Sequence, residues 1–170
     1  MIMNTNEYLE NMRIRLASQY DIYNSYDLQG VKTELYAHFY SRNERYVASK
    51  SATLYAYESN EHTFFKSVST LDVLSIYNFT EHLKSTIDDF VEPHAEHMST
   101  RLNAVFITHD PITDDVISHV KKFKYQKSYM FGLNGWVDVC LIVVSLSTGD
   151  VFTSRKAKKQ ANYFRPIPLQ

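Results

Sequence analysis

The spacing of hydrophobic residues along the chain predicts alternating helices and strands. Apolar residues recur at helical spacing over residues 5–20, which predicts a helix there. Asn4 and Glu7, three positions apart, have the pattern of a capping box at its start. In residues 31–40 the apolar side chains instead occupy alternate positions, which is typical of a strand with one buried face.

The same periodicities continue through the rest of the chain. The expected elements after the first helix are strands over residues 31–40, 46–57 and 62–68, a long helix from Ser69 to Pro93, a strand over 102–108, a helix beginning at 113–115, a short strand over 127–131, a strand over 136–146 and an edge strand over 151–154. Polar residues predict turns at 42–44 and 58–61 and a bend near 49–51.

This order of elements predicts an α+β fold. It runs helix, three-strand meander, long helix, strand, helix, strand, which corresponds to a mixed sheet with flanking helices. The chain has 170 residues, of which 44% are hydrophobic, and this is enough for a sizeable core. With 4 Gly and 4 Pro there is no linker, so residues 1–170 are expected to form a single domain. Residues 155–170 form a basic and aromatic C-terminal tail.

The predicted order resembles the core of the restriction-endonuclease-like (PD-(D/E)xK) fold. The run AVFITH at residues 104–109, followed by TDDVI at 113–117, looks like the strand and helix of Mrr-like members of that fold. Residues 42–46, 58–61, 122–125 and 131–136 are also similar to an uncharacterised bacterial domain family. The resemblance implies a nuclease-related protein of bacterial origin.

Nucleases of that fold hold a divalent metal with an acid at the start of one strand and an acid two residues before a lysine on the next. The lysine that corresponds here is Lys66, but Phe64 stands two residues before it. The remaining weak candidates for such a site are Glu34, Glu58 and Glu61. We therefore expect a degenerate site, in which these carboxylates and Lys66 hold no metal. Catalytic activity is not expected, and any that remains would be that of a metal-dependent nuclease.

Charge is divided unevenly along the chain, although the net charge is only −1. Residues 1–120 carry 9 Lys and Arg against 17 Asp and Glu, whereas residues 121–170 carry 9 against 2. The candidate binding residues in the basic part are Lys121, Lys122, Lys124, Lys127, Arg155, Lys156, Lys158 and Lys159. Lysines interleaved with aromatic residues can neutralise phosphates while the rings stack on bases. Alternatively, the basic part meets an acidic face of the same chain or of another copy.

Other residues that could carry chemistry form no complete motif. His94 and His97 share a helix face if that segment is helical, and are weak candidates for a metal site. His109 and Asp110 follow a buried strand, where ligands often bind, but Asp is equally common before a helix. The single cysteine, Cys140, lies in an apolar run and is expected to be a buried small hydrophobe. Glycine-rich nucleotide loops are absent, and no cofactor is expected.

Two functional hypotheses remain open. The first is a non-enzymatic binding or self-assembling protein, such as a homodimer, in which basic and acidic surfaces of two protomers meet. The second is a nucleic-acid-binding relative of the nuclease fold, whose basic residues share one concave face. The N-terminus resembles no signal peptide and no run has the length of a membrane span, so a cytoplasmic protein without membrane partners is expected.

Overall fold

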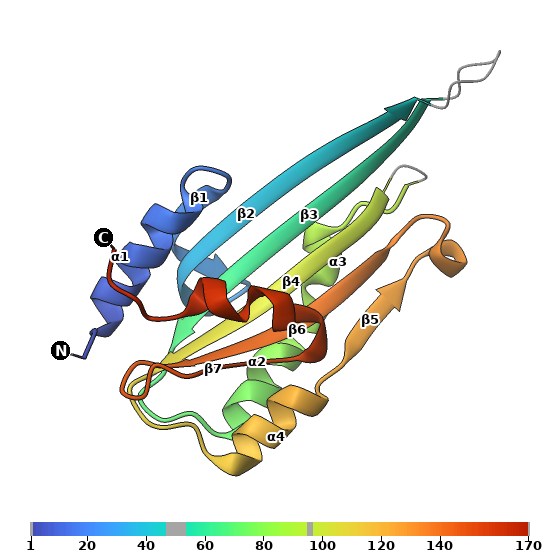
Figure 1. Ribbon diagram of the computed structural model, residues 1–170. Coiled ribbons are helices and arrows are strands. Elements are labelled where there is room, and N and C mark those ends of the chain that lie inside the picture. Colours follow the sequence, from blue (N-terminus) through green and yellow to red (C-terminus); the bar gives the residue numbers. More distant parts are fainter. Residues whose placement is uncertain (1, 47–53, 95–96, 170) are drawn as a thin grey trace.

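The computed structural model describes residues 2–46, 54–94 and 97–169. Helices pack on both faces of one mixed seven-stranded sheet, which confirms the predicted α+β class (Figure 1). No helix within these residues has the length and apolar character needed to cross a membrane.

The sheet is built from an antiparallel meander followed by parallel strands. The strands are β1 (Asp21–Leu28), β2 (Val31–Tyr46), β3 (Leu54–Ser67), β4 (His97–Thr108), β5 (Tyr125–Ser128), β6 (Trp136–Ser145) and β7 (Val151–Thr153). Strands β1, β2 and β3 pair antiparallel, β3 and β4 as well as β4 and β6 pair parallel, and β5 and β7 both pair antiparallel with β6. The β2–β3 hairpin extends beyond the rest of the sheet (Figure 1).

Helices cover the two faces of the sheet unequally. The helical elements are α1 (Thr5–Leu16), α2 (Val73–Ser85), α3 (Ile87–Phe90), α4 (Asp114–Lys122) and the 3₁₀ helices η1 (Met130–Gly132) and η2 (Arg155–Phe164). On one face, here called the α1 face, α1 and η2 pack against the sheet. On the other, the α2 face, lie α2, α3 and α4. Figure 1 shows η2 crossing the sheet beside α1.

The two cores follow from the alternation of side chains along each strand. Tyr36 and Phe64 are buried on the α2 face, whereas their neighbours Leu35 and Phe65 are buried on the α1 face. Strand β6 is apolar on both faces because helices cover both, and this explains its unbroken hydrophobic run.

The predicted boundaries of the meander are wrong. The turns expected at residues 42–44 and 58–61 lie within β2 and β3, where Arg42 pairs with Glu58 and Ser41 with Ser59. Residues 58–61 continue the pairing of β3 with both β2 and β4, so their polar side chains mark no turn. Strand β1 was not predicted, because an exposed edge strand shows little apolar alternation. The bend expected near residues 49–51 lies outside the described residues.

The predicted long helix begins later and is divided. Its N-cap is Asp72 rather than Ser69, and the Asp72 carboxylate accepts a hydrogen bond from the Ser75 amide (2.7 Å). A break at Thr86 separates α2 from α3. The helical spacing proposed for His94 and His97 is also wrong, because His97 is the first residue of β4 and His94 lies outside any helix.

Candidate functional site: a basic cleft at the sheet edge

The candidate site lies at the edge of β6, between the short strands β5 and β7 that both pair with it. One edge of β6 pairs with β4, so both β5 and β7 occupy the other edge. Strand β5 ends its pairing at Val139 and β7 begins at Ile142. Between them Ser154 closes the ladder: its amide donates to the Leu141 carbonyl (2.9 Å) and its hydroxyl accepts from the Leu141 amide (3.0 Å). The chain then turns away into η2, and the edge opens beside Val139.

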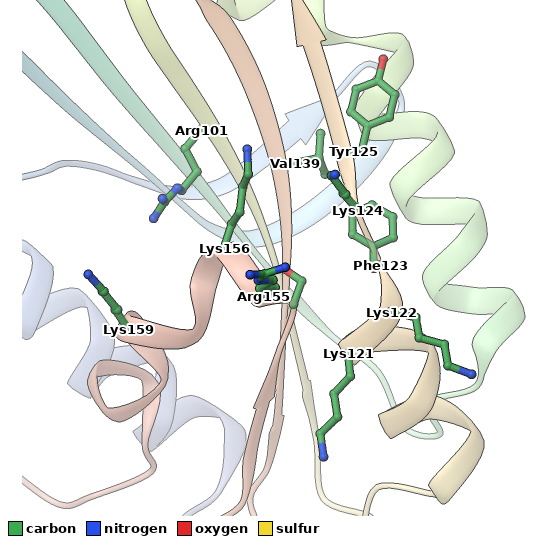
Figure 2. Close-up of a pocket in the computed structure, with 11 residues that line it drawn as sticks. Arg101, Lys121, Lys122, Phe123, Lys124, Tyr125, Val139, Arg155, Lys156 and Lys159 are labelled. Carbon is green, nitrogen blue, oxygen red and sulfur yellow. The ribbon is translucent and has the colours of Figure 1, made fainter.

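A cavity of about 650 Å³ occupies this opening (Figure 2). Its lining residues are Arg101, Lys121, Lys122, Phe123, Lys124, Tyr125, Val139, Ser154, Arg155, Lys156 and Lys159, here called the basic cleft. They come from β4, the end of α4, β5, β6 and η2, so the topology brings together segments that are far apart in sequence. None of the described residues that line the cleft is acidic.

Few of these charges are neutralised locally. Lys156 forms an ion pair with Asp138, whose side chain is only 10% exposed and also accepts from Gln126 (3.1 Å). That pair fixes the start of η2 on β6. Figure 2 shows Arg101, Lys156 and Lys159 on one side of Arg155, while Lys121 and Lys122 extend away on the other. The cations therefore surround an opening that an extended anion could follow.

Two aromatic rings line one side of the cleft, next to Lys124 (Figure 2). Phe123 and Tyr125 are half-buried against the core of the α2 face. Lys84 lies over both, with its Nζ 4.8 Å from the centre of the Tyr125 ring and 5.7 Å from that of Phe123. Lys84 also forms an ion pair with Glu81 (2.6 Å), so it packs over these two rings without adding an unpaired positive charge to the cleft.

Residues 4–166 match the family described as Domain of unknown function (DUF8052). The chain belongs to this family. Neither curated proteins nor solved structures gave a match to it.

Most of the basic residues proposed from sequence line the cleft of this DUF8052 domain. Lys121, Lys122, Lys124, Arg155, Lys156 and Lys159 all do so. Lys127 instead pairs with Asp88 (3.2 Å), and this hydrogen bond raises the pKa of the lysine. Lys158 is exposed on η2 but is not part of the lining. Sequence reasoning missed Arg101, whose only signal is its alternation with buried residues of the same strand.

The residues considered for a degenerate nuclease site lie at three separate places. Glu34 accepts from the Ser67 amide (2.8 Å), and Lys66 donates to the Lys32 carbonyl (2.6 Å), both at one end of the β2–β3 pair. Glu58 lies eight residues further along that pairing, about 26 Å at roughly 3.3 Å per residue. Alternation places Glu61 on the opposite face, with the α1-face residue Phe65.

Glu58 and His94 form part of a polar cluster on the α2 face. The Glu58 carboxylate contacts His94 (2.8 Å), Arg42 (3.6 Å) and the Tyr40 hydroxyl (3.1 Å). Within the described portion of the chain no three His, Cys, Asp or Glu side chains are arranged to hold a metal ion.

Cys140 has no nucleophilic environment in this DUF8052 domain. Its side chain is fully buried in the α1-face core, one residue beyond the cleft wall at Val139. Burial raises the pKa of the thiol to about 11, so the thiol stays protonated near neutral pH. The cysteine is a packing residue, as its apolar surroundings in the sequence indicate.

Proposed function

We propose that this domain binds a nucleic-acid strand through its phosphate backbone in the basic cleft. The observation that carries the proposal is the convergence of seven cationic side chains on one cavity that no described acidic side chain lines. Lys and Arg that neutralise phosphates release condensed counterions, which favours binding with little dependence on base sequence. Micromolar or weaker affinity at physiological salt is the ordinary range for such contacts.

The arrangement of the strands supports a distant relation to the restriction-endonuclease-like fold. An antiparallel meander, a helix and two parallel strands follow one another in the order that the resemblance implies. Separation of Glu34, Glu58 and Glu61 favours binding over metal-dependent cleavage. Bacterial origin and cytoplasmic location remain predictions from the sequence.

Charge reversal on η2 tests the proposal with a matched control. Arg155 and Lys158 are both exposed cations on this helix, but only Arg155 lines the cleft. We expect Arg155→Glu to weaken binding of a fluorescent oligothymidine about five- to tenfold at low salt, because one phosphate contact is replaced by repulsion. Lys158→Glu should change the dissociation constant less than about twofold. Fluorescence anisotropy measures both.

Equal losses in the two variants would show that only the overall charge matters and that the cleft is not the binding site. No binding by the unaltered protein would overturn the proposal directly. Circular dichroism of each variant verifies that the fold is retained.

The second candidate function is self-association, which the tip of the β5–β6 hairpin favours. Met130, Phe131 and Leu133 are 64%, 104% and 75% exposed. Met130 and Phe131 also have φ angles of 48° and 53°, a left-handed conformation that costs non-glycine residues about 1 kcal/mol or more each. Strained, exposed apolar residues at a loop tip are typical of a contact surface.

Sedimentation velocity tests self-association. If the tip joins protomers, Phe131→Ser should shift the sedimentation coefficient from dimer to monomer, because the contact loses its largest apolar side chain. Leu74→Ser, at another well-exposed apolar position on α2, is the control and should leave the coefficient unchanged. A monomer at all concentrations in the unaltered protein would rule the candidate out.

A further inference from the structure

A second pocket adjoins the basic cleft on the α1 face. Its volume is about 280 Å³, and its lining residues are Leu16, Gln19, Tyr20, Glu61, Thr63, Lys159, Gln160, Tyr163 and Phe164. Lys159 lines both cavities, so a ligand held by phosphate in the cleft can reach this pocket with an adjacent group.

Glu61 is the acidic group of this pocket, and Lys159 is its basic group. Its Oε1 accepts from the Tyr20 hydroxyl (2.9 Å) and from the amide nitrogen of Asn103 (3.1 Å). Its Oε2 has only a longer contact, with the amide nitrogen of Gln160 (3.3 Å). Burial, followed by the charge of Glu61, raises the pKa of Tyr20, so this hydroxyl remains a donor at neutral pH. One carboxylate oxygen is therefore well satisfied and the other is not.

Two further acceptors beside Glu61 have no donor among the described residues. They are the buried amide oxygens of Asn103 and Gln160, whose amide nitrogens both point to Glu61. Asn103 is fully buried between β3 and β6, where an unpaired polar group is unfavourable. One carboxylate oxygen of Glu61 thus has spare accepting capacity, and two unpaired amide oxygens lie beside it.

We propose that this pocket binds a guanine base of the strand whose phosphates lie in the basic cleft. Guanine presents two neighbouring donors, N1–H and the N2 amino group, on its Watson–Crick edge, which suits a carboxylate with an under-used oxygen. Adenine, cytosine and thymine each present one donor group on that edge. Tyr20, Tyr163 and Phe164 supply aromatic walls for the ring. The inference rests on the proposed function and adds base preference to it.

Inosine tests the proposal because it is guanosine without the N2 amino group. Labelled oligothymidines carrying guanine or hypoxanthine at the same central positions are compared by fluorescence anisotropy. We expect the guanine strand to bind about five- to tenfold more tightly, the discrimination ordinary for one good base contact. In Glu61→Gln the two strands should bind equally, while affinity for plain oligothymidine changes less than about twofold. Glu81→Gln, on α2, is the control and should keep the preference.

The outcomes separate the base pocket from the cleft. If the unaltered protein binds both strands equally, or Glu61→Gln keeps the preference, the guanine pocket is wrong and the cleft stands. If no oligonucleotide binds at all, the proposed function itself fails. The comparison of guanine with hypoxanthine in the unaltered protein needs no variant, so a folding defect in Glu61→Gln leaves the proposal falsifiable.

Discussion

His62 and His38 stack on adjacent strands of the α2 face, with 4.3 Å between ring centres. His62 is only 5% exposed, and its Nδ1 forms a hydrogen bond with the Tyr36 hydroxyl (2.7 Å). Burial, followed by the charge of His38, lowers the pKa of His62 to about 3. The folded protein therefore keeps this ring neutral at pH values where the unfolded chain protonates it.

This difference predicts that acid destabilises the fold through His62. The contribution of neutral His62 to the free energy of unfolding is fully present above pH 6.5, the approximate pKa of histidine in the unfolded chain. It is lost as pH falls toward 3, because the unfolded chain binds a proton that the folded protein does not. The slope from one residue is about 1.4 kcal/mol per pH unit below pH 6. Urea unfolding at several pH values should show this slope. In His62→Gln the free energy of unfolding should fall less steeply with decreasing pH, by the amount that His62 contributes.

An exposed, non-titrating position provides the control, since Leu74→Gln on α2 should unfold with the same pH dependence as the unaltered protein. Parallel curves for the unaltered protein and His62→Gln would mean that the ring titrates normally and that its burial has no such effect.

At the scale of elements, α1 and the C-terminal segment hold each other in place. Arg15 donates to the carbonyls of Tyr163 (3.1 Å) and Arg165 (2.9 Å), and also to that of Ile167. Tyr8 adds a buried bond from its hydroxyl to the Phe164 carbonyl (2.8 Å). Because η2 carries Arg155, Lys156 and Lys159, these contacts position three of the seven cations of the cleft.

Tyr8→Phe is expected to reduce the free energy of unfolding by about 1–2 kcal/mol, because the buried Phe164 carbonyl loses its donor while packing is retained. Urea denaturation measures the loss. Tyr77→Phe, on the exposed surface of α2, should change stability by less than about 0.5 kcal/mol. An unchanged midpoint in Tyr8→Phe would show that water replaces the lost donor.

Elements with strong local signals could be predicted from the sequence. The capping box of Asn4 and Glu7 forms with both of its hydrogen bonds, and the apolar run predicted over residues 136–146 is β6. The β2–β3 hairpin was misplaced because its polar residues continue the strand pairing rather than form a turn. Local turn propensity cannot distinguish polar residues within a long hairpin from those of a turn.

At the scale of the whole molecule, the uneven charge along the chain is only partly reproduced in space. The basic residues near 121–127 and 155–159 were visible in the sequence, and six of them meet at the cleft. Arg101 was missed and Glu61 was named only for a metal site, because the two become neighbours only through the parallel pairing of β3 with β4. The acidic remainder includes a pocket on the α2 face with Glu58, Asp89 and Glu92.

The cleft is one site on a nearly neutral molecule. The association constant for nucleic acid should therefore depend on salt concentration only as strongly as a small number of phosphate contacts predicts. If about five cations contact a single strand, the logarithm of the association constant should fall with the logarithm of salt concentration at a slope near −3.5.

Lys124→Gln should reduce the magnitude of this slope by about 0.7, since it removes one contact. Lys158→Gln, outside the cleft, should leave the slope unchanged. Anisotropy titrations over a salt series measure all three slopes. A slope weaker than about −1 in the unaltered protein would show that backbone phosphates do not supply the binding free energy.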